Sequence, residues 1–89
     1  MFYVYILKSR IDKKLYIGYT ANLKRRVVEH NEGLSRSTKP RRPLDLIYHE
    51  AYASQADAEQ REFRLKNSAG AYTALKRRIK DCLRLSHLV

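Results

Sequence analysis

Phe2 to Leu7 (FYVYIL) and Leu15 to Tyr19 (LYIGY) are the two stretches that decide the fold of this chain. Both are rich in aromatic and β-branched residues, which favour strands, and the first predicts a strand buried on both faces. Residues 10–13 between them are polar and turn-like, so the two strands are expected to form an antiparallel hairpin. Gly18, inside the second strand, is expected where the strand bends or where another group approaches its backbone.

The next segments predict a helix, a loop and a third strand. Asn22 can cap a helix that runs from Leu23 to about Asn31, with Gly33 as its stop. Residues 33–43 (GLSRSTKPRRP) are rich in Gly, Ser and Pro, which is typical of a loop. Residues 44–52 predict the third strand. One side of that strand is expected to carry Leu44, Leu46 and Tyr48.

The last part of the chain predicts further helices. Ser54 followed by Asp57 resembles a capping box and predicts a helix from Gln55 to about Asn67. Gly70 is expected to interrupt the helical pattern before a last helix. Four residues at helical spacing are expected to close the core from that helix: Tyr72, Leu75, Ile79 and Cys82. The chain is therefore expected to fold as one α+β domain, residues 1–89, in the order ββαβαα.

The charge balance points to a polyanionic partner. Nineteen Lys and Arg against nine Asp and Glu give a net charge of +10, and hydrophobic residues make up 44% of the chain, enough for a globular fold. Such a charge attracts polyanions. The basic residues are spread over every segment rather than gathered on one amphipathic helix, so nucleic acid is favoured over an anionic lipid surface.

Cysteine use and hydropathy bear on location. Cys82 is the only cysteine, so no intramolecular disulfide is possible and a reducing compartment fits. Met1 to Leu7 is too short to span a membrane and lacks the features of a signal peptide. We therefore expect a cytoplasmic protein without membrane association.

Tyr5 and Tyr16 are the first candidates for chemistry. The short turn between their strands is expected to place them almost opposite each other across the hairpin, where neighbouring side chains on one face lie ~5 Å apart. Each tyrosine taken alone is explained by core packing. Two phenolic hydroxyls close together beside basic groups could also hold a water molecule for attack on phosphorus.

Glu62 is a carboxylate on the apolar stripe of its helix, between Ala58 and Leu65. Burying an unpaired carboxylate is costly, so it needs a partner. Two interpretations are open: an ion pair with Lys66 one turn later, or a ligand for a hard cation such as Mg²⁺, which takes one or two carboxylates together with phosphate oxygens and water. The position on an apolar stripe favours the metal.

Arg26 and His30 lie four residues apart on one helix face. An arginine beside a reacting phosphate can neutralise developing charge, and a nearby histidine can relay a proton or hold the attacking water. An exposed basic face is the alternative, and we accept it for Arg25. Contacts to the nucleic acid backbone are expected from Arg25, Lys39, Arg41, Arg42 and Lys66, with hydroxyl residues of the loop beside them. Zinc-ligand spacing, a Ser/His/Asp set and a glycine-rich phosphate loop are all missing from the sequence.

These residues together resemble the GIY-YIG nuclease superfamily. Residues 3–5 (YVY) and 16–18 (YIG) are similar to its two signatures, with Tyr3 in place of the first glycine, and Arg26 stands eight residues after Gly18, where the catalytic arginine is expected. The continuation is also similar, through Glu29-His30-Asn31, residues 38–48 and the segment around Glu62. The resemblance covers residues 2 to about 66 and is greatest to the small, single-domain YhbQ-like branch.

The resemblance implies a three-stranded antiparallel sheet flanked by helices and hydrolysis of DNA phosphodiesters with one divalent metal, Mg²⁺ or Mn²⁺. It implies that Glu62 binds the metal, that Arg26 stabilises the pentacoordinate phosphate, and that His30 belongs to the site. One of Tyr5 and Tyr16 would act as general base or orient the water, and the choice between them stays open. No small-molecule cofactor is expected.

The leading hypothesis is thus a metal-dependent DNA endonuclease with weak sequence preference, of the kind used in DNA repair or recombination. The alternative is a non-catalytic, basic nucleic-acid-binding module that retains the fold. A monomer and a homodimer are both compatible with the sequence.

Overall fold

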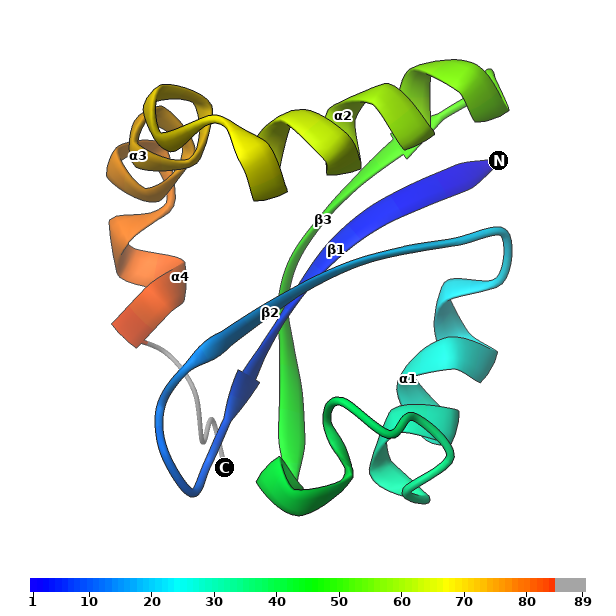
Figure 1. The fold of residues 1–89 in the computed structure, drawn as a ribbon, viewed down its shortest axis with the longest axis vertical. Helices are drawn as coiled ribbons and strands as arrows, with labels where there is room; N and C mark the ends of the chain where they lie inside the picture. The colour runs from blue at the N-terminus through cyan, green and yellow to red at the C-terminus, as the bar shows by residue number, and fades with distance from the viewer. Residues whose placement is uncertain (85–89) are drawn as a thin grey trace.

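The computed structural model describes residues 1–84 and has an antiparallel sheet with helices against both faces (Figure 1). Three strands, β1 (Phe2–Ser9), β2 (Leu15–Thr20) and β3 (Leu44–Tyr52), lie in the order β2-β1-β3. The helices are α1 (Leu23–Asn31), α2 (Gln55–Asn67), α3 (Ala69–Arg78) and α4 (Lys80–Arg84), with a 3-10 turn at Lys39–Arg41. The predicted α+β class is confirmed, and the predicted last helix is divided in two.

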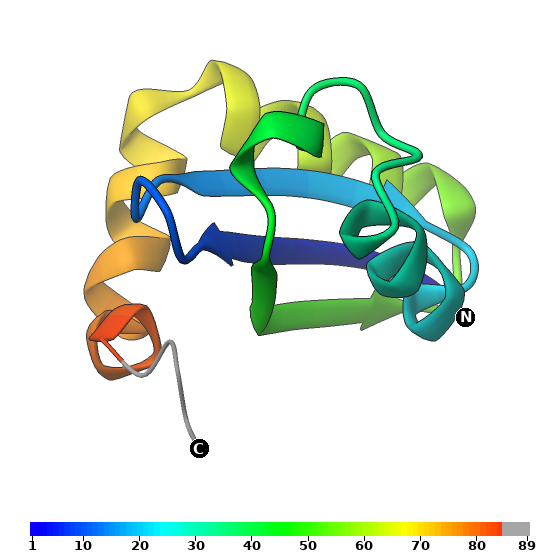
Figure 2. The same ribbon diagram turned by 90° about the horizontal axis from the view of Figure 1, so that it is seen from below.

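Two packed layers enclose the sheet. Figure 2 views it from the side that α1 and the following loop cover, and α2 lies behind it. The central strand β1 is buried on both faces, as predicted: Val4 and Ile6 point to α2 and α3, while Tyr5 and Leu7 point to α1. Against α2 and α3 the core consists of Val4, Ile6, Ile17, Ala58, Leu65, Leu75 and Ile79. The α1 side carries a smaller apolar cluster that includes both candidate tyrosines.

The hairpin register differs from the sequence-based prediction. Tyr5 pairs with Gly18, and Tyr16 pairs with Leu7, so the two tyrosines are diagonal neighbours rather than nearly opposite each other. The displacement is two residues along the strand, which preserves the face because side chains alternate with a period of two. Both tyrosines therefore still lie on the α1 side of the sheet.

A bulge between β1 and β3 changes the faces of the third strand. Leu7 pairs with Leu46, whereas the preceding Ile6 pairs with Tyr48, so one extra residue of β3 is accommodated there. Leu46 consequently shares the α1 side with Leu44, and Tyr48 packs on the α2 and α3 side. The prediction that Leu44, Leu46 and Tyr48 share one side is wrong, because strict alternation does not anticipate the bulge.

The boundary between α2 and α3 is at Ser68 rather than at Gly70. Ser68 has an extended backbone, with φ −122° and ψ 110°, and its side chain caps α3 by accepting a hydrogen bond from the amide of Ala71. Gly70 lies inside α3. A serine supplies an N-cap hydroxyl, so this break needs no glycine. Over residues 1–84 no helix combines the length and the apolar character that crossing a bilayer requires.

Candidate active site

Tyr5 lies with its ring across the backbone of β2 at Gly18. A Cβ atom at position 18 would be 2.3 Å from both Cζ and the hydroxyl oxygen of Tyr5, so no side chain fits beneath the ring. The glycine therefore serves the close approach that its place in a strand predicts. Tyr5 is only 1% exposed, and its hydroxyl must be satisfied by protein groups.

Tyr16 lies beside Tyr5 on the outer strand of the hairpin and is partly exposed. The two ring centroids are 6.4 Å apart, and the Tyr16 ring also meets the imidazole of His30 edge-on, with centroids 5.0 Å apart. The two tyrosines therefore both pack in the small core and lie close together, because the same aromatic cluster places both phenols beside one imidazole. The difference in burial between the two phenols separates the roles that they can take.

His30 is completely buried under the aromatic pair, and both of its ring nitrogens are hydrogen-bonded. Nε2 lies 2.8 Å from the hydroxyl of Tyr5, and Nδ1 lies 2.8 Å from Oγ1 of Thr38. Burial disfavours the imidazolium, and the positive charge of Arg26 adds to the effect, so the pKa of His30 falls to about 4 although Glu29 partly opposes the change. The imidazole is therefore neutral at pH 7.

The depressed pKa of His30 makes the protein sensitive to mild acid. The unfolded chain takes up a proton at an ordinary pKa of about 6.5, which the folded state excludes until the pH approaches about 4. The unfolding free energy should therefore decrease as the pH falls through this window, by at most about 1.4 kcal/mol per pH unit. Urea denaturation between pH 7 and 4 measures it. In His30→Gln, which has no titratable ring, this part of the slope should disappear; an unchanged slope would show that His30 titrates normally.

Arg26 approaches the same hydroxyl from α1. Its Nη1 donates a hydrogen bond of 3.1 Å to Oε1 of Glu29, and its guanidinium also interacts with the hydroxyl of Tyr5. Burial raises the pKa of Tyr5 to about 12, more than the opposing effect of the Arg26 hydrogen bond can offset, and the nearby charges of Tyr16 and Glu62 act in the same direction as burial. Tyr5 is thus a neutral phenol at pH 7, between an arginine and a neutral histidine.

Glu62 reaches the site from α2, on the other layer of the fold. Its side chain is 24% exposed and forms an ion pair of 3.0 Å with Lys66, so the ion-pair interpretation of the sequence is realised. Nζ of Lys66 also lies 5.8 Å from the centroid of the Tyr16 ring, which places this pair beside the tyrosines. Residues 1–84 contain no group of three or more His, Cys, Asp or Glu that could hold a metal. A cation at Glu62 would therefore have one protein carboxylate and take its other ligands from water and substrate.

The residues expected to contact nucleic acid differ in their exposure and in their contacts within the protein. Arg25 and Lys39 are exposed. Arg42 donates from Nε to the carbonyl oxygen of Lys39. Arg41 is half-buried, and its Nε lies 3.3 Å from a carboxylate oxygen of Asp12, so its charge is turned into the protein. The structure thus separates Arg41 from the outward-facing basic residues, a distinction that the sequence of the loop does not contain.

A second polar cluster, between β3 and α2, was not predicted from the sequence. The carboxylate of Glu50 accepts hydrogen bonds from Nε and Nη2 of Arg61, at 2.9 and 3.0 Å, and from the hydroxyls of Tyr48 and Tyr52. Burial favours a raised pKa, but the hydrogen bonds from Arg61, Tyr48 and Tyr52 prevail and hold the pKa of Glu50 below its usual range. These contacts, called here the Glu50–Arg61 clip, fix α2 to the sheet one residue before Glu62. The alternation of Tyr48, Glu50 and Tyr52 is the one local sign of it in the sequence.

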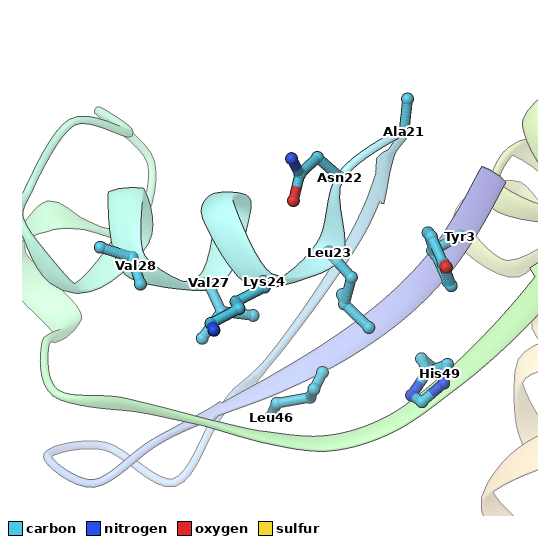
Figure 3. Close-up of a pocket in the computed structure, with 9 residues that line it drawn as sticks. All are labelled: Tyr3, Ala21, Asn22, Leu23, Lys24, Val27, Val28, Leu46 and His49. Atoms are coloured by element: carbon cyan, nitrogen blue, oxygen red, sulfur yellow. The ribbon is translucent and has the colours of Figure 1, made fainter. Parts of the chain in front are cut away.

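An open groove lies on the other flank of α1, between that helix and β3 (Figure 3). Lys24 and Val28 line it from α1. From the strands, Tyr3 of β1 and His49 of β3 meet edge-on, with ring centroids 5.9 Å apart. Leu46, 38% exposed because of the bulge, forms part of the lining. None of the five predicted site residues lines the groove, so it is separate from the tyrosine cluster.

Comparison with known proteins identifies a family for this chain. Residues 1–77 match the family model described as the GIY-YIG catalytic domain. A UPF0213 protein of Staphylococcus haemolyticus is 45% identical over 65 residues, which is 72% of this chain and 78% of that protein. One from Natronomonas pharaonis is 43% identical over 70 residues, covering 78% of this chain and 81% of the relative.

A solved structure agrees with the fold. The solution NMR structure of the UPF0213 protein BH0048 from Bacillus halodurans superposes with a TM-score of 0.58 at 27% identity, covering 99% of this chain and 97% of that one. The family model carries a nuclease-type function, DNA as substrate and a general dependence on divalent metal. The chain belongs to the GIY-YIG nuclease superfamily, in its group of small UPF0213 proteins.

Proposed function

We propose that this protein is an endonuclease that hydrolyses phosphodiester bonds of DNA with weak sequence preference and depends on Mg²⁺ or Mn²⁺. One observation carries the proposal: four elements that are separate in the sequence bring two phenols, an arginine, a neutral histidine and a carboxylate to one place. A nucleic-acid-binding module has no need of a carboxylate there, since its charge repels phosphate.

The difference in burial between Tyr5 and Tyr16 favours different roles for the two tyrosines. Tyr16 is partly exposed and can hold the attacking water through its hydroxyl. Tyr5 is 1% exposed, and its pKa of about 12 keeps it protonated, so it is better suited to orienting Arg26 and His30 than to accepting a proton. We therefore assign the water-orienting role to Tyr16.

Arg26 and Glu62 fit the electrostatic part of phosphoryl hydrolysis. The guanidinium of Arg26 is a fixed, permanently charged donor that can neutralise charge developing on the phosphate oxygens. Glu62 would hold the divalent cation, which supplies Lewis-acid stabilisation of the same phosphate. A single carboxylate fits Mg²⁺, because this ion keeps several water ligands and binds substrate oxygens.

Basic residues with side chains accessible to solvent would position the DNA backbone around this site. We assign this role to the exposed Arg25, Lys39 and Lys66 and to the partly exposed Arg42. Contacts of this kind set orientation without reading sequence, which accords with weak sequence preference. Arg41, paired with Asp12, is left out of the set. We extend the proposal to a cytoplasmic role in DNA repair or recombination, where branched and flapped substrates occur.

A panel of DNA structures tests the proposal. Duplex, single-stranded, flapped and branched DNA, each labelled at one end, would be incubated with the protein and Mg²⁺, Mn²⁺ or EDTA. We expect nicking of at least one structure with either metal and none with EDTA, because the carboxylate needs its cation to stabilise the phosphate. Binding without cleavage under every metal would contradict the enzyme and favour the non-catalytic module.

A further inference from the structure

A chain of polar contacts runs from the loop before β3 to Arg26. Oγ1 of Thr38 lies 2.8 Å from Nδ1 of His30, whose Nε2 lies 2.8 Å from the hydroxyl of Tyr5. The guanidinium of Arg26 interacts with the same hydroxyl and lies at the far end of this series of contacts. Thr38 and His30 are each 0% exposed, and Tyr5 is 1% exposed, so bulk solvent does not reach these contacts.

The chemistry of Arg26 decides which group donates and which accepts in each of these hydrogen bonds. A guanidinium carries only donors and a positive charge, so in this interaction it faces the oxygen of Tyr5 and not the hydroxyl hydrogen. The hydrogen of the Tyr5 hydroxyl then needs an acceptor of its own, and within residues 1–84 the side chain placed to accept it is His30 at Nε2. A neutral imidazole that accepts at Nε2 carries its hydrogen on Nδ1. That hydrogen points at Thr38, which accepts it.

The opposite arrangement leaves a buried group unsatisfied. If His30 carried its hydrogen on Nε2, the donors of both His30 and Arg26 would be directed at the oxygen of Tyr5. The Tyr5 hydrogen would then have no acceptor in the described part of the chain, and an unmade hydrogen bond in a buried site is costly. The hydroxyl of Thr38 can accept the hydrogen of Nδ1, and without it that hydrogen would be buried and unsatisfied in the tautomer that Tyr5 and Arg26 require.

We propose that Thr38 is a positioning residue that holds His30 in the Nδ1–H tautomer, so that Tyr5 donates to Nε2 and keeps its oxygen available to orient Arg26. The link to catalysis rests on the proposed function, whereas the tautomer does not. The loop that is expected to contact the DNA backbone through Lys39 and Arg42 thus also sets the orientation of the arginine.

Nitrogen NMR of histidine-labelled protein at pH 7 tests the tautomer directly. The His30 signals can be assigned by their loss in His30→Gln. We expect a pyrrole-type shift at Nδ1 and a pyridine-type shift at Nε2 in the wild type and in Thr38→Ser, which keeps the hydroxyl. Thr38→Val is close in shape but removes the acceptor, and it should move the population toward Nε2–H. A wild-type Nε2–H tautomer, or no change in a folded Thr38→Val, would overturn the proposal.

Cleavage kinetics test the consequence for Arg26. In Thr38→Val we expect kcat to fall about tenfold while KM for DNA changes less than about twofold, since a buried hydrogen bond is lost but the backbone contacts remain. Thr38→Ser should retain wild-type kcat. Equal loss in both variants would contradict a role of the hydroxyl. If the wild-type protein cleaves no DNA, the proposed function fails, and the NMR result still decides the tautomer.

Discussion

Glu62→Ala is expected to lower kcat for metal-dependent DNA cleavage by about a thousandfold or more, because it removes the carboxylate that we assign to the cation. The fold should be unaffected, since the partly exposed Glu62–Lys66 ion pair one helical turn apart contributes only a few tenths of a kcal/mol, roughly. DNA affinity measured with EDTA present should stay the same or increase, because the variant frees the charge of Lys66 and removes a carboxylate that repels phosphate. Single-turnover cleavage and fluorescence anisotropy separate these two effects.

Glu59→Ala is the matched control for this prediction. Glu59 lies on the same helix three residues earlier and is exposed, so its removal changes the net charge equally without touching the site. Its kcat should remain within about twofold of the wild type. A Glu62→Ala protein that cleaves as fast as Glu59→Ala would show that metal binding does not depend on this carboxylate.

Glu50→Ala is expected to reduce the unfolding free energy by about 3 kcal/mol, because it leaves the largely buried guanidinium of Arg61 without its partner. The side chains of Glu50 and Arg61 are 15% and 24% exposed, and the carboxylate also accepts from two tyrosine hydroxyls. Chemical denaturation at pH 7 measures the loss. The variant should also cleave DNA more slowly, because Arg61 fixes α2 immediately before Glu62.

Two further variants make this result specific. Glu32→Ala removes an exposed carboxylate and should change the unfolding free energy by less than about 0.5 kcal/mol. Arg61→Ala combined with Glu50→Ala should cost less than the two single changes added together, since the double variant leaves no buried charge unpaired. Additive losses would show that the clip contributes no coupling.

The strands and helices follow from local patterns in the sequence. FYVYIL predicts the buried central strand because every position is apolar or aromatic, and Asn22 and Ser54 mark helix starts because their side chains cap free backbone amides. Arg26 and His30 were expected on one helix face, since a spacing of four residues nearly completes a turn. These effects act over a few residues, and that is why they can be read without a structure.

Pairing between distant segments is less accessible to such reasoning. The register that puts Gly18 under Tyr5, and the bulge that separates Leu46 from Tyr48, depend on how whole strands fit together. The sequence places Thr38 among the hydroxyl residues of a basic loop, whereas the structure buries it against His30. The Glu50–Arg61 clip likewise joins residues eleven positions apart on different elements.

The sequence by itself determined the α+β class and the basic character and indicated five candidate site residues, because composition, capping and helical spacing are local properties. Only the tertiary structure decided which tyrosine is buried, that burial keeps His30 neutral, that Lys66 pairs with Glu62, and that Arg41 turns inward. These features depend on burial and on contacts between separate elements, and both exist only when the helices are packed on the two faces of the sheet.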